Sequence, residues 1–441
     1  MSTPHTNEIG TLIDESALTL GRVWVVVLCG LVVLLDGYDI QTMSLAVPSL
    51  TEEWALAPSA FSLALSASVL GMLIGAALLG PFGDKLGRRP FLIWGMTIVG
   101  IASLATALAT TPEQLVAWRL LTGVGLGTSL PNATALTSEY VPRRTRAFSI
   151  SAMFISIALG ALIAGFTAPA LIDAFGWRSI FVVGGALPLL VALLLFACVP
   201  ESLQLLVTHR PDDPRIPVLA RRYLPKIDPA TIFARLEDRV ERQSVAALFA
   251  PRFWARTCLL WVVFALNLFV LFVLISWLPT ILTEAGWTRA QALRGAVVIQ
   301  AGGIFGGLVI SRLVDRGRTV PAMAGGYIIV AVCFAVFLIA PPSLPNWTVL
   351  LLLIGGGVSG SQAALTALSA IFYPSGLRAT GAGWASMSGR AGAAVAPIAG
   401  GIALSHLDLG PAQYLALLIP PVLLCGVCVL ALPYVWREAR N

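Results

Sequence analysis

The length, composition and charge of this chain exclude a soluble protein. Of its 441 residues, 57% are hydrophobic and only 11% are charged, whereas a typical soluble domain has about 25% charged residues. The net charge of +6 does not indicate nucleic-acid binding, because the arginines lie between apolar blocks rather than in one basic segment. We therefore expect an integral membrane protein.

Twelve apolar stretches are long enough to cross a bilayer as helices, which takes about 20 residues each. They follow a polar N-terminal tail, 1–22, in which no cleavable signal peptide is apparent. In chain order the predicted spans are 23–47, 60–82, 91–110, 113–135, 146–171, 178–198, 257–282, 292–312, 320–340, 346–371, 379–404 and 411–434.

A charged, proline-containing linker, 199–256, divides the spans into two groups of six. It separates a predicted N-terminal bundle, 23–198, from a predicted C-terminal bundle, 257–434, and a short tail, 435–441, follows. Within the linker, the pattern of 229–243 fits a surface helix and a solvated segment about equally well.

Basic residues mark the even-numbered loops, counted between successive spans. These loops hold ten Lys and Arg, whereas the odd-numbered loops carry only three arginines at their edges. The positive-inside rule therefore predicts that the even loops, the linker and both termini face the cytoplasm. We expect the membrane to be a bacterial inner (plasma) membrane.

The two halves of the chain repeat each other. After span two comes GPFGDKLGRRP (80–90), and after span eight comes ISRLVDRGRTV (310–320). After span four comes SEYVPRRTRAFSISAM (138–153), and after span ten comes AIFYPSGLRATGAGWASM (370–387). Two echoes at corresponding places indicate duplication. We predict an all-α polytopic membrane protein with twelve transmembrane helices in two six-helix pseudo-symmetric bundles, an architecture typical of transporters.

Several motifs resemble those of the major facilitator superfamily. GDKLGRR (83–89) resembles its loop after span two, RLLTGVGLG (119–127) its span-four motif, and PES (200–202) the end of its span six. LDGYD in span one and GWASMSGRAGAAVAPIAGG (383–401) in span eleven resemble the aromatic acid:proton symporter branch. The resemblance covers essentially the whole chain and implies the major facilitator fold.

Span one carries two carboxylates, Asp36 and Asp39, three residues apart and hence on one helical face. A charged Asp at the centre of a lipid-facing helix costs about 2.5–3.5 kcal/mol, so this face is expected to line a wet cavity. Two carboxylates so close resist ionising together, which favours a proton on one of them. We predict that the pair carries the coupled proton, without dividing the role between them. The alternative is that they cap a helix break at Gly37 or pair permanently with an Arg.

Arg119, early in span four, needs an anionic partner because a guanidinium stays charged. The resemblance implies that spans one and four line the cavity, so that Arg119 pairs with Asp36 or Asp39 and takes part in proton coupling. A purely structural ion pair is the alternative.

Arg390 lies near the centre of span eleven, between small residues that leave room around its guanidinium. We predict that it binds the carboxylate of a substrate, and the alternative is pairing with a helix carbonyl. Further substrate-binding candidates are Asn267, Gln300 and Gln362, which could orient a hydroxyl, and Tyr38, Tyr327 and Trp384, which could stack on a ring.

The resemblance also implies a gate at the membrane surface. Asp84 would hold the N-terminal end of span eleven, where the helix dipole favours an anion, and Arg88 would pair with Glu139 at the end of span four. Both contacts would hold an outward-open state and break on inward opening. An ordinary positive-inside loop is the alternative.

Other patterns do not indicate chemistry. The three histidines are scattered, and the six cysteines lie in apolar stretches with only Cys425 and Cys428 close together, so we expect no metal site, disulfide framework or bound cofactor. The glycine-rich segments GVGLGT (123–128), GGIFGG (302–307) and GGGVSG (355–360) lie within predicted spans. We interpret them as sites of close helix packing rather than phosphate loops.

These observations predict a proton-coupled importer of a small aromatic carboxylate, such as a hydroxybenzoate, that works as a monomer by alternating access. A proton symporter of another organic acid or of a sugar is the alternative. Drug efflux is disfavoured because LGALIAGFTAPAL in span five lacks the antiporter signature of the superfamily. We do not expect an enzyme, because no nucleophile–base pair or metal set lies at a common depth, nor a receptor, because no signalling domain is apparent.

Overall fold

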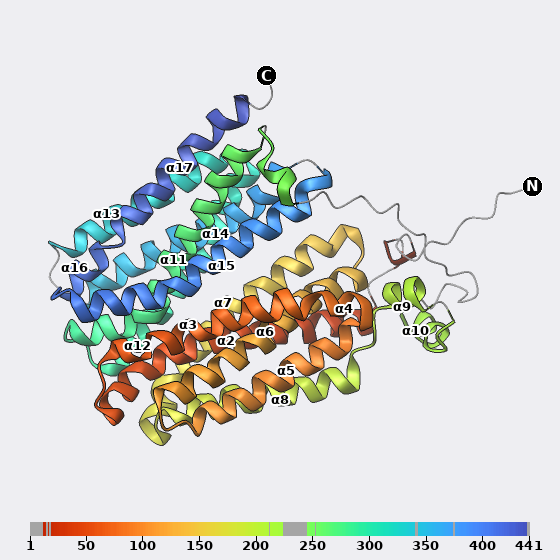
Figure 1. Cartoon of the computed structure of the whole chain (residues 1–441), viewed down its shortest axis with the longest axis horizontal. Coiled ribbons are helices and arrows are strands. Elements are labelled where there is room, and N and C mark those ends of the chain that lie inside the picture. The colour runs from red at the N-terminus through yellow and green to blue at the C-terminus, as the bar shows by residue number, and fades with distance from the viewer. Residues whose placement is uncertain are drawn as a thin grey trace, which may run out of the picture.

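The computed structural model describes residues 12–14, 16, 19–210, 212–223, 245–251, 253–339, 343–373 and 375–438. Throughout these residues the regular structure is helical. Figure 1 shows the helices gathered into two bundles that lie side by side.

Twelve long helices in the described residues follow the predicted spans in the same order. The N-terminal bundle contains α2 (Leu20–Trp54), α3 (Ser62–Leu78), α5 (Arg88–Ala107), α6 (Pro112–Tyr140), α7 (Arg143–Phe175) and α8 (Arg178–Cys198). The C-terminal bundle contains α11 (Trp254–Glu284), α12 (Arg289–Asp315), α13 (Thr319–Phe337), α14 (Leu344–Phe372), α15 (Ser375–His406) and α17 (Ile419–Glu438). The predicted all-α fold class is confirmed.

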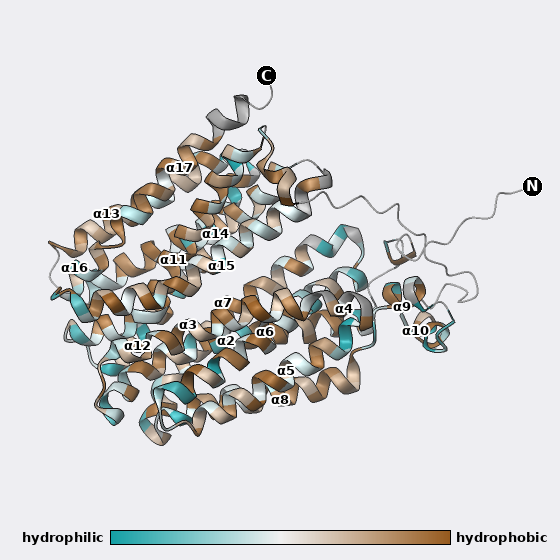
Figure 2. Ribbon diagram, viewed as in Figure 1, coloured by the Kyte–Doolittle hydropathy of each residue, from teal (hydrophilic) through white to brown (hydrophobic). Residues whose placement is uncertain are grey.

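Short helices connect these elements. They are η1 (Pro58–Phe61), α4 (Gly80–Leu86), α9 (Leu203–His209), α10 (Arg215–Tyr223), η3 (Val245–Phe249) and α16 (Pro411–Ala416). In Figure 2 α9 is largely apolar, whereas α10 carries hydrophilic residues, and both lie beyond the apolar lengths of the bundles. The segment 229–243, for which a surface helix and a solvated linker were both expected, lies outside the described residues.

Ten helical segments of the described chain are long and apolar enough to cross a membrane, and α6 and α15 are not among them. Both are long, with 29 and 32 residues. Their lower hydropathy follows from their composition, since each carries an arginine within the membrane-spanning length, Arg119 or Arg390, among Gly, Ser and Thr. These two helices are therefore long enough to cross the membrane, but they contain polar groups that need partners inside the protein.

Helix α2 continues to Trp54, seven residues beyond its predicted end, with Pro48 inside it. The extension carries Glu53, whose carboxylate accepts hydrogen bonds from Trp177 Nε1 and Arg178 Nη1, both at 2.7 Å. Burial of Trp177 thus stabilises a helical end that is too polar for the hydropathy pattern to have included.

The glycine-rich segments are places where helix backbones meet, as we interpreted them. A Cβ at Gly123 would collide with the carbonyl of Ser68, and one at Gly127 with that of Met72, so α6 lies directly on α3. In the C-terminal bundle, Gly302 lies against the Leu352 carbonyl, which brings α12 onto α14 in the same way.

The two bundles touch near one end. Val69 of α3 packs with Ala393 and Ala394 of α15, and nearer the ends of the same helices Gly401 lies against the hydroxyl of Ser62. Figure 1 shows the bundles diverging from this contact toward α4 and α9.

Candidate functional site

The two carboxylates of α2 are both buried, with Asp36 3% and Asp39 4% exposed. Because residues three apart lie on one face of a helix, the pair forms a short acidic stripe on α2. Asp39 lies one turn nearer the end where the bundles touch. The surroundings of the two carboxylates differ.

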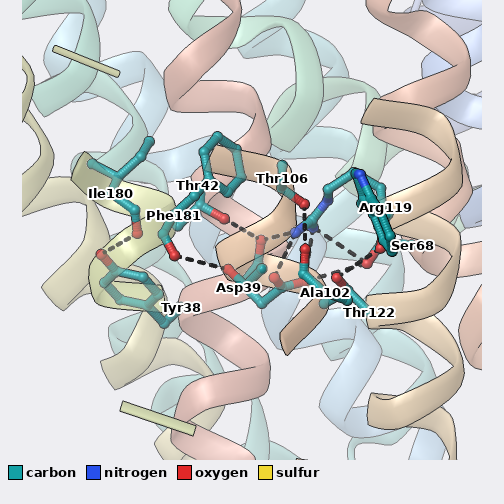
Figure 3. A network of polar contacts seen from close by, with 12 residues as sticks. Tyr38, Asp39, Thr42, Ser68, Ala102, Thr106, Arg119, Thr122, Ile180 and Phe181 are labelled. Carbon is teal, nitrogen blue, oxygen red and sulfur yellow. Dashed lines mark hydrogen bonds and ion pairs between the residues drawn. The ribbon is translucent and has the colours of Figure 1, made fainter. Parts of the chain in front are cut away.

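Asp39 forms a two-pronged ion pair with Arg119 of α6. Arg119 Nη1 donates to Oδ1 at 2.6 Å, and Nη2 donates to Oδ2 at 2.7 Å. Ser68 of α3 donates to Oδ2 at 3.2 Å, and the guanidinium lies 5.9 Å from the centre of the Phe181 ring. Figure 3 shows these groups converging from several helices of one bundle. Of the two partners predicted for Arg119, the structure selects Asp39.

Within the described residues, Asp36 forms no such ion pair. Its buried Oδ1 accepts no hydrogen bond in the described part of the chain. The nearby charges that act on it are Asp39 and, from the other bundle, Arg390 of α15. The site therefore holds two acids and two arginines. Asp39 is tightly paired with Arg119, whereas Asp36 is attracted by the positive charge of Arg390 in the other bundle.

Arg390 is partly exposed and lies next to the surface where α15 meets α11. Gly392 allows α15 to rest on the carbonyl of Ala265, and Gly389 lies against Phe264. The next turn, at Ala394, packs against Val69 of the other bundle. Arg390 is thus one turn from the contact that joins the two bundles, on their facing surfaces.

Two predicted polar candidates meet in the C-terminal bundle. Asn267 of α11 donates through Nδ2 to Gln362 Oε1 of α14 at 2.8 Å, and to the Val358 carbonyl at 3.4 Å. Tyr327 of α13 donates its hydroxyl to Asn267 Oδ1 at 3.0 Å. Asn267 and Tyr327 are each 1% exposed, whereas Gln362 is half-buried.

Among the described residues, no hydrogen bond joins the remaining substrate-binding candidates to this site. Tyr38 donates its hydroxyl to the Ile180 carbonyl of α8 at 3.2 Å and lies inside the N-terminal bundle, so we leave it out of the site (Figure 3). Trp384 stacks on Trp261, with ring centres 5.8 Å apart. The side chain of Gln300, in α12, forms no hydrogen bond with any described residue.

The gate residues are only partly described. Arg88, at the start of α5, pairs with Glu139, near the end of α6, at 2.8 Å. The side chain of Asp84, in α4, lies outside the described part of the structure. The predicted contact between Asp84 and α15 therefore stays a prediction.

Two groups that the sequence analysis passed over join distant elements. Glu201 Oε1 accepts the backbone N–H groups of Arg88 at 2.9 Å and Arg89 at 3.3 Å, so it caps α5 from the end of α8. Glu52 of α2 pairs with Arg289 of α12 at 2.6 Å, which joins the two bundles at their contacting end. The PES segment and the acidic end of span one were the available signals.

Other sites for chemistry are sparse. No group of three His, Cys, Asp or Glu within the described residues could hold a metal ion. A pocket of about 310 Å³ opens between the end of α8 and α10, lined by Arg89, Cys198 and Arg222 among others. It shares no residue with the central site, and we do not assign it to transport.

Comparisons with known proteins agree with this geometry. Residues 29–397 match the sequence model of the Major Facilitator Superfamily. The chain is similar to the 4-hydroxybenzoate transporter PcaK of Acinetobacter baylyi, with 35% identity over 426 residues, 95% of this chain and 92% of that protein. It is 33% identical to a gallate transporter of Pseudomonas putida over 422 residues, 95% of this chain and 93% of that protein.

Among solved structures, a D-xylose-proton symporter matches with a TM-score of 0.66 and 18% sequence identity, over 94% of this chain and 98% of that one. A bacterial homologue of the human lysosomal transporter Spinster, in an inward-facing and occupied conformation, also matches with a TM-score of 0.66 and 18% identity, over 96% of this chain and 98% of that one. At this identity the likeness shows the fold alone.

Proposed function

Because this chain belongs to the Major Facilitator Superfamily, in its aromatic acid:proton symporter family, we propose that it imports a small aromatic carboxylate together with a proton. It is a multi-pass membrane transporter and not an enzyme. The relatives named as 4-hydroxybenzoate and gallate transporters support a hydroxybenzoate-like substrate.

The unequal environment of the two buried aspartates carries the proposal. Asp39 is bound through both carboxylate oxygens by the Arg119 guanidinium, and together with Ser68 this contact joins α2, α3 and α6. Asp36 is buried with an unpartnered oxygen, so it is the carboxylate that gains most from binding a proton. We therefore assign the transported proton to Asp36 and the supporting ion pair to Asp39 and Arg119.

Charge balance then links the proton to the substrate. With Asp36 ionised, its charge acts on Arg390 across the interface. A proton on Asp36 removes that charge, and the guanidinium of Arg390 becomes available to a substrate carboxylate, which it can bind through two parallel hydrogen bonds. When Asp36 loses the proton, its carboxylate again competes with the substrate carboxylate for Arg390, and the substrate is released.

Alternating access follows from rocking of the two bundles around this site. The contact between α3 and α15 closes one end, and we propose that this end faces outside. In that state the carboxylates and Arg390 are reached from the cytoplasm. The resemblance implied that the Arg88–Glu139 pair breaks on inward opening, but the pair is formed in this state. We therefore propose only Asp84 as a gate residue that exchanges partners when the bundles rock the other way.

The test is uptake of radiolabelled 4-hydroxybenzoate into proteoliposomes with an imposed pH gradient, acid outside. Wild type is expected to accumulate the acid only with the gradient. Asp36→Asn is expected to lose gradient-driven accumulation but to keep exchange of labelled for unlabelled substrate, since exchange needs no net proton movement. Arg390→Ala is expected to lose both, because the substrate carboxylate has lost its partner.

Two results would reject the proposal. Accumulation by wild type that ignores the gradient would remove proton coupling, and full uptake by Arg390→Ala would remove the anion site. Accumulation of D-xylose or of an aliphatic acid in place of the aromatic acid would favour the alternative substrate classes.

A further inference from the structure

The polar chain from Tyr327 through Asn267 to Gln362 has no role in the charge mechanism. All three side chains belong to the C-terminal bundle, and two of them are buried. Buried polar groups that are fully hydrogen-bonded are rigid and hold their neighbours in one orientation. The direction in which these hydrogen bonds run decides what the half-buried Gln362 offers to a ligand.

The Val358 carbonyl fixes that direction. A backbone carbonyl only accepts hydrogen bonds, so the Asn267 atom that lies 3.4 Å from it is the amide nitrogen. The same nitrogen lies 2.8 Å from Gln362, whose facing atom must then be the acceptor Oε1. The Tyr327 hydroxyl donates to the remaining Asn267 oxygen at 3.0 Å. Gln362 is therefore held with its NH₂ group turned away from Asn267.

That NH₂ group is free to bind a ligand. The hydrogen bonds of the Gln362 side chain within the described residues involve Oε1 alone, and the side chain is half-buried. One turn further along α14, Thr366 is exposed. Gln362 therefore presents two fixed donors at the edge of the packed bundle.

The amide pair lies at the depth of the charged site. Asn267 stands twelve residues before Pro279 of α11, as Asp36 stands twelve residues before Pro48 of α2, so the two occupy matching positions on the first helix of each half. The segment of α15 around Arg390 packs on α11 at Phe264 and Ala265. Arg390 and the amide pair are thus within one turn of each other along α11.

We propose that Gln362 is a specificity-determining residue, which donates a hydrogen bond to an oxygen substituent on the substrate ring while Arg390 holds the carboxylate. Asn267 and Tyr327 act through Gln362 as positioning residues. This inference rests on the proposed function and adds to it the residue that recognises the ring substituent of the substrate.

The test compares ligands that differ only in that substituent. Binding of benzoate, the hydroxybenzoates and the matching methoxybenzoates is measured by tryptophan fluorescence of purified protein, so that it does not depend on transport. Wild type is expected to bind one hydroxybenzoate isomer about tenfold tighter than benzoate, as one hydrogen bond in a desolvated site allows. In Gln362→Leu this ratio is expected to fall to about one, with benzoate binding changed less than about threefold.

A second variant reverses the polarity of the contact. Gln362→Glu keeps the oxygen that accepts from Asn267 but replaces the donor by an acceptor. A ring hydroxyl can then donate to the carboxylate, so hydroxybenzoate binding is expected to persist. The methoxybenzoate can only accept, and its affinity is expected to fall about tenfold relative to wild type. Gln204→Glu, in α9 outside the spans, makes the same chemical change as a control.

Tyr327→Phe tests the positioning role. Removing the hydroxyl leaves Asn267 Oδ1 without its donor and loosens the hold of Asn267 on Gln362, so the ratio of hydroxybenzoate to benzoate affinity is expected to fall severalfold. A merely structural role would instead weaken both ligands alike. Asn267→Asp, which keeps an acceptor toward Tyr327 but removes the donor toward Gln362, is expected to lower the same ratio.

The outcomes separate this inference from the proposed function. If the Gln362 variants weaken benzoate and hydroxybenzoate by the same factor, the specificity role is overturned while aromatic acid binding stands. If wild type binds none of these acids, the proposed function fails and the inference fails with it. An unchanged affinity ratio in every variant also overturns the inference.

Discussion

Removing the charge of Asp39 should destabilise the protein far more than removing that of Asp36. Asp39→Asn leaves the buried Arg119 guanidinium without its counter-charge, which typically costs about 3–5 kcal/mol. Asp36→Asn removes a carboxylate with an unpartnered oxygen and is expected to unfold at or above the wild-type temperature. Thermal unfolding of the two variants in detergent measures the difference. Equal melting temperatures would contradict the assigned pairing.

At this scale the sequence predicted residue types better than it predicted partners. The stripe of Asp36 and Asp39 and the need of Arg119 for an anion follow from the cost of charge in a membrane. Which carboxylate Arg119 meets depends on how α6 is rotated against α2 and on the hydroxyl of Ser68 from a third helix. The residue spacing within one helix determines neither how that helix is rotated against its neighbour nor which side chains it meets from a third helix.

Close backbone contact between α2 and α7 makes a testable difference between glycines. A Cβ at Gly37 would collide with the Ile157 carbonyl, whereas a Cβ at Gly307 of α12 meets no atom within 4 Å. Gly37→Ala is therefore expected to destabilise the protein by about 1–3 kcal/mol, as overpacking does. Gly307→Ala is expected to be neutral or slightly stabilising, because alanine is the better helix former.

Thermal unfolding and expression level of the two variants check this element-scale prediction. A Gly37→Ala variant as stable as Gly307→Ala would mean that α2 and α7 lie further apart than the structure has them. Because Gly37 lies between Asp36 and Asp39, the wild-type glycine also sets how closely the acidic stripe approaches α7.

Element positions were predictable where apolar length decides them and less so elsewhere. Helix α8 begins and ends at Arg178 and Cys198, the predicted limits, because apolar residues fill it from end to end. Helix α2 extends to Trp54 because Glu53 finds Trp177 and Arg178, a contact made only in the folded bundle. The cap of Glu201 on α5 joins residues 113 positions apart, beyond the reach of local pattern.

The charges of the central site and of the transported species together predict electroneutral transport. Asp36, Asp39, Arg119 and Arg390 sum to zero when both acids are ionised, and one proton with one aromatic carboxylate adds no net charge. Uptake is therefore expected to follow the pH gradient and to ignore an imposed membrane potential, which would otherwise contribute about 2.3 kcal/mol per charge per 100 mV. Potassium-diffusion potentials imposed with valinomycin at constant pH check this. Potential-driven accumulation would show that a second proton moves.

The Glu52–Arg289 pair should bias which end of the molecule is open. It joins the bundles at 2.6 Å, but Glu52 is 78% exposed, so such a pair contributes at most about 1 kcal/mol. That is enough to change a population ratio about fivefold. Arg289→Glu is expected to raise amide hydrogen exchange in the 55–62 segment between α2 and α3, and the double swap with Glu52→Arg is expected to restore it. Unchanged exchange in Arg289→Glu would show that apolar packing alone closes this end.

Asp36 and Asn267 occupy matching positions on the first helix of each half, and this placement gives the two halves different roles. In the mechanism that we propose, the N-terminal half binds the proton through Asp36, and the C-terminal half recognises the substrate through the Asn267–Gln362 pair. Substitutions in the C-terminal half can then change the substrate specificity without altering the proton-binding residues of the N-terminal half. A chimera that joins residues 1–244 of this chain to the second half of a relative is expected to have the substrate specificity of that relative. It is expected to keep the pH dependence of uptake of this chain.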